Sequence, residues 1–260
     1  MDDWLKKRLL CDDVKPHIED ENWQGVYDAL TGGHSVMFSD AAATFSAFLI
    51  DEIECNPVPE LTKIYRKQFA DVQKLTHLEI TPNIKLVDSY ALIESNISHV
   101  TLCSPDTILE PGAFSNCNSL KTATLPSRMK TFPSSLFYNS GLTKFIFPED
   151  SIEVGRFMFY GCTGLTSVTL SDNIVIIRFS AFGNCRSLRT IYIPKSVEYI
   201  TPEAFDGCIS LTEITFEKGS KVQLDEDSLP NNRELIVKCS AQDTALIESL
   251  KALNINYKEI

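Results

Sequence analysis

Apolar residues recur along the chain with a fixed period. Residues 165–187 and 188–210 have nearly the same order of apolar and polar positions: each opens with Leu-x-x-aliphatic-x-aliphatic, continues to an Ala-Phe pair and ends shortly after a Cys. Similar openings recur every 22 or 23 residues, at Leu75, Ile97, Leu120, Leu142, Leu165, Leu188 and Leu211. A period in the low twenties predicts a solenoid in which each repeat forms one coil and packs against its neighbours.

The opening of each repeat predicts one short β-strand per coil. In residues 165–170 the inward positions are Leu165, Val168 and Leu170, and the residues between them are threonine or serine. Neighbouring coils then place these strands side by side in a sheet along one face of the solenoid, with the hydroxyl side chains outward. The return side of the coils is predicted to be filled by a row of phenylalanines at Phe114, Phe137, Phe159, Phe182 and Phe205.

The full pattern, L-T-x-I-x-I-P-x-x-V-x-x-I-x-x-x-A-F-x-x-C, resembles the BspA-like leucine-rich repeat of bacterial surface proteins, protists and some phage-encoded proteins. Residues 97–232 match it closely and residues 75–96 loosely. The departures are Ser140 in place of Cys, Leu136-Phe137 and Met158-Phe159 in place of Ala-Phe, and Ser171 in place of Pro. The resemblance implies an α+β repeat solenoid, a right-handed leucine-rich-repeat coil, with a habit of binding and no catalytic motif.

The segments that flank the repeats are predicted to cap them. Apolar residues at helical spacing predict helices over residues 21–30, 39–54 and 60–72, so residues 1–74 are interpreted as an acidic helical N-terminal cap. Residues 75–232 then form about seven coils. A C-terminal cap over residues 233–260 is expected to contain a strand at 235–237, a helix over about 241–253 capped by Ser240, and a final segment over 255–260.

Four of the eight cysteines, Cys117, Cys162, Cys185 and Cys208, occur at the same position of successive repeats. The chain has no Cys-x-x-Cys pair of the kind that holds zinc. Stacked positions on adjacent coils lie within bridging range, but side chains in one inward row do not point towards each other. The row is therefore interpreted as buried reduced thiols, which suits a reducing compartment.

The net charge of −11 is concentrated near the N-terminus. Residues 1–60 contain 13 acidic and four basic side chains, a net charge of −9. A solvated face is the simple explanation, whereas nucleic-acid mimicry or docking to a basic partner is the specific one. The second explanation makes the chain an acidic inhibitor that acts through residues 1–60, as a phage-encoded protein would.

The sequence contains no apolar run of about 18 residues, so no membrane span is expected. Its N-terminus places acidic residues before the basic cluster and has no uninterrupted apolar segment, which is unlike a secretory signal. A cytoplasmic location is expected on this basis.

Neither catalysis nor metal binding is expected. His77, His99 and Glu79 fall on the outward strand face, where two histidines and a carboxylate are a possible zinc ligand set, but such a set also arises by chance on a repeat surface. Cys103 near His99 suggests a Cys-His nucleophile, yet no third orienting group is identified. No phosphate-binding loop, dinucleotide fingerprint or nucleophile elbow is present, so no cofactor is expected either.

What remains is the outward strand face, rich in threonine and serine and carrying more basic than acidic side chains. We expect a non-catalytic protein–protein interaction module that binds a protein partner through this face, with no direct binding of nucleic acid or membrane. The oligomeric state is not predicted. The candidate contact residues are Lys121, Lys144, Ile146, Arg189, Tyr192 and Glu213.

Overall fold

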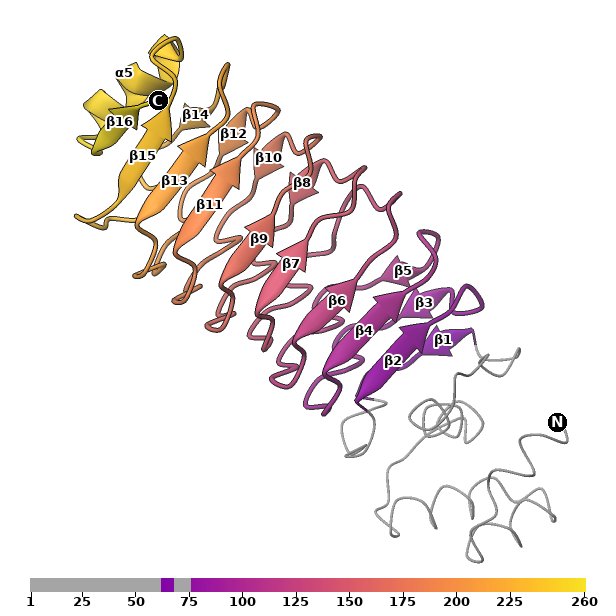
Figure 1. The fold of residues 1–260 in the computed structure, drawn as a ribbon. Helices are drawn as coiled ribbons and strands as arrows, with labels where there is room; N and C mark the ends of the chain where they lie inside the picture. Colours follow the sequence, from indigo (N-terminus) through magenta and orange to yellow (C-terminus); the bar gives the residue numbers. More distant parts are fainter. Residues whose placement is uncertain (1–61, 68–75) are drawn as a thin grey trace, which may run out of the picture.

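A computed structural model describes residues 62–67 and 76–260 (Figure 1). Most coils contribute one strand to each of two rows that run along an elongated body. The first row consists of β2 (His77–Ile80), β4 (His99–Leu102), β6 (Thr122–Thr124), β7 (Lys144–Ile146), β9 (Ser167–Thr169), β11 (Thr190–Ile193), β13 (Glu213–Phe216), β15 (Ile236–Cys239) and β16 (Tyr257–Glu259). Two-residue strands make the second row: β1 (Lys63–Ile64), β3 (Leu86–Val87), β5 (Ile108–Leu109), β8 (Glu153–Val154), β10 (Ile176–Ile177), β12 (Tyr199–Ile200) and β14 (Gln223–Leu224).

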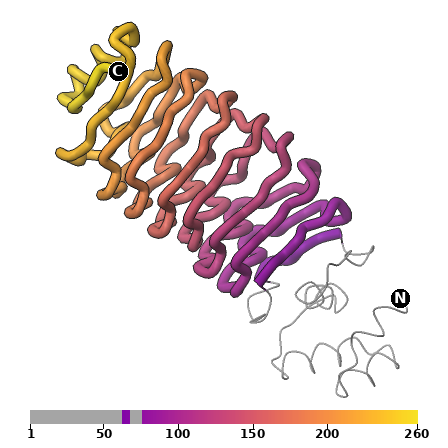
Figure 2. Tube along the Cα trace, in the orientation of Figure 1, coloured from indigo at the N-terminus to yellow at the C-terminus, as the bar shows by residue number. Residues whose placement is uncertain are grey.

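All the strand pairs of the described residues are parallel, as expected when consecutive coils follow the same path. The first row forms three hydrogen-bonded groups, β2-β4-β6, β7-β9 and β11-β13-β15-β16, which lie next to one another (Figure 1). The tube in Figure 2 follows the chain as it repeats the same coil from residue 76 towards the C-terminus. The predicted repeat solenoid of parallel strands is therefore confirmed.

The core of the solenoid is organised around the predicted phenylalanine row. Each of the five rings is fully buried. Neighbouring rings stack with centroids 5.1–5.7 Å apart, for example Phe159 on Phe182 at 5.5 Å and 7° between planes. Because each of the three inner rings contacts the rings of the coils before and after it, the row connects the coils through aromatic contacts as well as through apolar burial.

Each phenylalanine of this row lies between two tight turns. The second residue after it has a positive φ in every coil, and these positions hold asparagine or glycine: Asn116, Asn139, Gly161, Asn184 and Gly207. These are the residue types that adopt the left-handed conformation at least cost. The second residue before the ring also has a positive φ, but there the chain uses Gly112, Ser135, Phe157, Ser180 and Glu203. The residue types therefore predict the turn after the phenylalanine, whereas they do not predict the turn before it.

The cysteine row is buried beside the phenylalanines, and the described cysteines are free thiols. Each repeat thiol donates to a carbonyl oxygen of the preceding coil, as Cys185 Sγ does to Phe159 O at 3.2 Å and Cys208 Sγ to Phe182 O at 3.0 Å. Ser140, which interrupts the row, lies 3.3 Å from Cys162 Sγ. The thiols therefore act as small, weakly donating core groups that connect successive coils.

We expect the four repeat thiols to resist alkylation in the folded protein. Burial raises the pKa of Cys117 to about 12 and that of Cys162 to about 11, so neither supplies thiolate near neutral pH. Pulse alkylation followed by peptide mass spectrometry should label exposed Cys103 first and the repeat thiols only in denaturant. Alkylation of a repeat thiol as fast as Cys103, or a disulfide between two of them, would contradict this arrangement.

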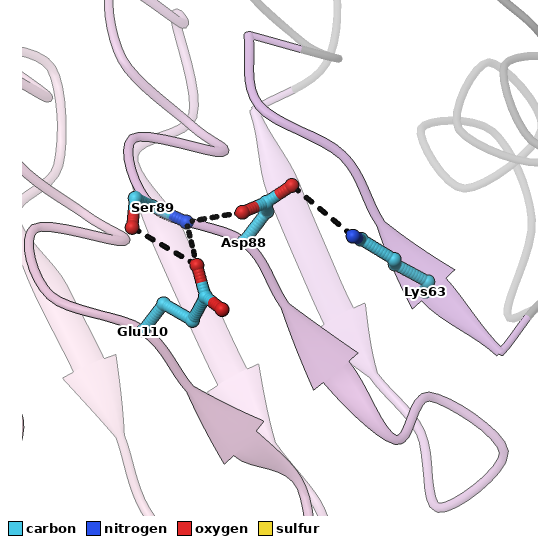
Figure 3. A network of polar contacts seen from close by, with 4 residues as sticks. All are labelled: Lys63, Asp88, Ser89 and Glu110. Atoms are coloured by element: carbon cyan, nitrogen blue, oxygen red, sulfur yellow. Dashed lines mark hydrogen bonds and ion pairs between the residues drawn. The ribbon is translucent and has the colours of Figure 1, made fainter.

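At its N-terminal end the structure corrects one prediction. Residues 62–67 were assigned to a helix over 60–72, but Lys63–Ile64 forms β1 and pairs in parallel with Leu86–Val87 of β3. A polar network joins these coils (Figure 3): Lys63 Nζ lies 3.3 Å from Asp88 Oδ2, and the Ser89 backbone N–H donates to Asp88 Oδ1 at 3.0 Å. The Ser89 hydroxyl donates to Glu110 Oε2 of the following coil at 3.0 Å.

The repeat architecture thus includes residues before the predicted start at Leu75. The other predicted N-terminal helices lie outside the described residues, so the helical N-terminal cap and the three-part division of the chain stay predictions.

At the C-terminal end the predicted strand, helix and closing segment are all present. The helix α5 (Thr244–Ala252) buries Leu246, Ile247 and Leu250 and is the one α-helix of the described residues. Its N-cap is Asp243 rather than the predicted Ser240. The Asp243 carboxylate accepts hydrogen bonds from the backbone N–H groups of Gly219 at 2.9 Å and Ser240 at 3.2 Å, so it fastens the loop before the helix instead of capping its first turn.

Candidate partner-binding surface

Alternation along the first-row strands creates a continuous outward face, here called the sheet face. In β2, Leu78 and Ile80 are buried, whereas His77 and Glu79 are exposed. Strands β4 and β11 show the same pattern of exposed and buried positions. The inward and outward positions predicted from the sequence are therefore correct along these strands.

Parallel register aligns equivalent outward residues into columns. Ile146 of β7 is the register partner of Thr169 of β9, and Tyr192 of β11 is the partner of Thr215 of β13. Since β9 and β11 are neighbours, Ile146, Thr169 and Tyr192 follow one another in the same column. The predicted apolar pair is thus two strands apart, roughly 10 Å at the usual strand spacing.

Both residues of this pair are strongly exposed, Ile146 to 70% and Tyr192 to 50% of its surface. The threonine between them is small, so it leaves both side chains accessible to one partner. The pKa of the Tyr192 hydroxyl is raised by partial desolvation and by the neighbouring carboxylates of Glu217 and Asp172. The ring therefore stays neutral at physiological pH and presents an amphipathic surface.

Three of the predicted contact residues are exposed cations: Lys121, Lys144 and Arg189. Lys144 lies in β7 two residues before Ile146, and Arg189 directly precedes β11. Among the described residues, no carboxylate lies within 4 Å of any of these three cationic groups. Their charges are therefore available to an approaching molecule.

Glu213 differs from the other five candidate contact residues because its charge is paired within the chain. Its carboxylate forms an ion pair with Lys238 Nζ at 2.6 Å and accepts a hydrogen bond from the Thr215 hydroxyl at 3.2 Å. The bond from Lys238 holds the pKa of the Glu213 carboxyl below its ordinary value. Because Glu213 already has partners within the chain, it offers an incoming ligand less than the free cations do.

His77 and His99, considered above as metal ligands, are neighbours in the structure. His77 and His99 are register partners, and their rings stack with centroids 4.4 Å apart and 2° between planes. Their Nδ1 atoms are engaged with the hydroxyls of Thr76 at 2.9 Å and Ser98 at 2.7 Å. Within residues 62–67 and 76–260, no three His, Cys, Asp or Glu side chains form a group suited to a metal ion.

Cys103 does not have the environment of a nucleophile. Its thiol donates to Glu79 Oε1 at 3.2 Å, a contact between coils that the sequence analysis missed. Partial burial and the neighbouring Glu79 carboxylate raise the pKa of Cys103 to about 11, which suppresses the reactive thiolate. The separation of 24 residues, close to the repeat period, was the signal that could have revealed this contact.

Comparison with known families gives the same architecture. The model of the BspA-type leucine-rich repeat region matches in six copies, over residues 42–156 and 130–234. The chain belongs to the BspA-type leucine-rich repeat family. This family model begins before the first coil predicted from the sequence, in agreement with the position of β1. Leucine-rich repeats generally mediate protein interactions.

No curated protein matches the chain. Among solved structures, a leucine-rich repeat protein of T. pallidum is 19% identical over 69% of this chain and 93% of its own, with a TM-score of 0.47. A leucine-rich repeat protein from Bacteroides ovatus is also 19% identical over 69% of this chain, with a TM-score of 0.45. The match spans 59% of that protein.

A leucine-rich cell surface protein from Faecalibacterium prausnitzii is 16% identical over 70% of this chain and 64% of its own, with a TM-score of 0.40. In the part of the present chain that the structure describes, no helix has the length and apolar character needed to cross a bilayer.

Proposed function

We propose that this chain is a non-catalytic binding module that engages a protein partner through its sheet face. The observation that carries the proposal is the column in which exposed Ile146 and Tyr192 flank Thr169. Lys144 and Arg189 lie beside it, and neither forms an ion pair within the described residues. Exposed aliphatic, aromatic and guanidinium groups are typical anchors of protein interfaces. The strands that hold them are each hydrogen-bonded to a neighbouring strand, β7 to β9 and β11 to β13, so little backbone entropy is lost on binding.

The size of the face also supports a protein partner. Strands spaced at about 4.8 Å give five neighbouring strands a width of roughly 20 Å, and three or four residues of strand extend about 10–13 Å, so the strands can supply the centre of a standard interface of about 800 Å² per side. The hydroxyl side chains around the central column can form a polar rim, as interfaces commonly have.

Placing a large, charged side chain on the sheet face by substitution tests the proposal directly. Thr169→Arg places a long side chain between Ile146 and Tyr192, and Glu198→Arg places the same side chain beside β12 on the other row. Capture from an extract of the native host, quantified by mass spectrometry, should recover a partner with the wild type and with Glu198→Arg. The same partner should be depleted at least about tenfold with Thr169→Arg. Equal recovery with all three proteins would refute binding through this face.

The second candidate function is an acidic inhibitor that acts through residues 1–60, which lie outside the described part of the chain. The observation in its favour is the net charge of −9 in that segment. An inhibitor of this kind occupies a basic, nucleic-acid-binding surface, so its affinity falls steeply with salt. Binding through the sheet face depends less on salt because its central contacts are apolar.

A further inference from the structure

A polar hollow of about 510 Å³ opens beside the start of β6 and β7. Every residue that lines it is glycine, serine, threonine, asparagine or lysine, so the lining contains no carboxylate and no large apolar side chain. The hollow is separate from the column formed by Ile146 and Tyr192, although Lys121 stands at its edge and also belongs to the sheet face.

A shortened repeat explains why the hollow is there. Leu120 and Leu165 each follow the phenylalanine of their turn by six residues, but Leu142 follows Phe137 by only five. The missing residue is the one that would stand between Asn118 and Thr163, so that row of side chains has a gap. Gly164 next to the gap has no side chain to fill it, and Gly141 packs too closely against the Asn118 backbone to have room for a Cβ.

The hollow contains polar groups whose side chains are not satisfied by the described part of the chain. Lys121 Nζ makes one long contact, 3.5 Å to Gly141 O, and no ion pair there. The Asn118 amide and the hydroxyls of Thr143 and Thr163 likewise have no hydrogen-bond partner among residues 62–67 and 76–260. One cation and three groups that both donate and accept therefore converge on the same space.

This combination selects a ligand with one anionic group and several hydroxyls. An ammonium group binds a carboxylate as a point charge. Amide and hydroxyl side chains match sugar hydroxyls, which also both donate and accept hydrogen bonds. An apolar peptide side chain or an acyl chain would find no large apolar side chain in this lining to pack against. A volume of several hundred cubic ångströms is in the range of small-ligand sites.

We propose that the hollow binds an acidic saccharide, with the sugar carboxylate on Lys121 and ring hydroxyls on Asn118, Thr143 and Thr163. The proposal does not rest on the protein-binding function of the sheet face, because neither Ile146 nor Tyr192 lines the hollow. Sugar binding is therefore expected to persist when Tyr192 and Arg189 are both replaced by alanine.

The test uses methyl β-D-glucuronide as probe, observed by saturation-transfer NMR with the full chain. We expect binding of the glucuronide. Methyl β-D-glucoside, which lacks the carboxylate, should bind at least about tenfold more weakly, the effect of losing one charge-assisted contact. Acetate, which has the carboxylate but no ring, should not displace the glucuronide at equal concentration.

Two variants locate the site. Lys121→Gln should weaken glucuronide binding at least about tenfold. Gly164→Leu should abolish binding, because the leucine side chain extends into the space of the hollow. The fold should tolerate it, since a Cβ at Gly164 makes only ordinary contacts of 3.6 Å and 3.9 Å with backbone oxygens. The matched control is Lys144→Gln, which removes a cation one strand further on, outside the lining, and should leave binding within about twofold.

Three results would overturn the proposal: no saturation transfer to the glucuronide, displacement by acetate at equal concentration, or equal losses for Lys121→Gln and Lys144→Gln. If Gly164→Leu lowers the melting temperature, the comparison of the two lysine variants still decides the question, because both lysines are exposed. Equal partner capture by the wild type and Thr169→Arg, together with glucuronide binding by the wild type, would refute the sheet-face function alone.

Discussion

Replacing Phe182 by alanine is expected to lower the free energy of unfolding by about 3–5 kcal/mol, the usual cost of emptying a fully buried aromatic site. The ring has no exposed surface and lies in the middle of the row, with Phe159 at 5.5 Å and Phe205 at 5.1 Å. The substitution removes both stacking contacts together with the buried apolar area. Chemical denaturation monitored by circular dichroism measures the change.

The damage should extend to both neighbouring coils. In a solenoid each repeat is stabilised by the interfaces with the repeats beside it, so a cavity in one coil weakens two interfaces. Hydrogen exchange should therefore become faster in β7 and β8 of the preceding coil and in β11 and β12 of the following coil. Protection that falls only within residues 165–187 would contradict nearest-neighbour coupling.

A milder substitution at the same position serves as a control. Leu92 occupies the position equivalent to Phe182 in an earlier coil and is fully buried, so the repeat accepts leucine there. Phe182→Leu should therefore cost less, about 1–2 kcal/mol, since most of the apolar volume is kept. Ile146→Ala removes a side chain that is 70% exposed and should change stability little. An alanine variant at Phe182 as stable as wild type would mean that the row is not the spine of the fold.

The repeat core could be predicted from the sequence because its signal is periodic. Seven repeats place the same residue types at the same positions, so a chance match at one of them does not shift the frame. The burial of Phe182 and Cys185 and the exposure of Tyr192 all follow from that frame. The tyrosine and isoleucine were also predicted to lie within one footprint, and the register places them in one column.

The errors arose where the structure depends on pairing between coils rather than on local pattern. Leu61, Ile64, Tyr65 and Phe69 have helical spacing, but Lys63–Ile64 is a strand because it pairs with β3 in the next coil. Ser240 is a good helix-capping residue by type, yet Asp243 takes that position while its carboxylate binds Gly219 in the preceding coil. In both cases the deciding partner lies more than 20 residues away in the sequence.

The two candidate binding sites also differ in how far the sequence predicts them. Exposed columns follow from the period, so the candidate residues of the sheet face could be named in advance. The hollow could not be predicted. The shortened spacing from Phe137 to Leu142 is visible in the sequence, but the neighbours of a missing residue can either move together or leave a gap. In the structure both happen: the backbone of Asn118 approaches Gly141 too closely to leave room for a Cβ, whereas space remains beside Gly164.

Tyr192→Ala combined with Arg189→Ala is expected to weaken partner binding by about 2 kcal/mol or more, the range of hot-spot truncations. The expectation follows from the exposure of the Tyr192 ring and from the Arg189 charge, which has no carboxylate within 4 Å among the described residues. Neither side chain belongs to the core, so the melting temperature should be unchanged. Isothermal titration with the captured partner measures the loss.

A charge-reversal variant distinguishes this surface from the acidic segment. Asp12, Asp13, Glu19, Asp20 and Glu21 lie outside the described residues, and their replacement by lysine reverses much of the local charge. If the sheet face binds the partner, the reversal should have the smaller effect, and the affinity of the wild type should change little between low and moderate salt. If the Tyr192/Arg189 variant instead binds like wild type while the charge reversal fails and binding collapses with salt, the partner is recognised by residues 1–60. The sheet face would then serve only as the solvated exterior of the solenoid.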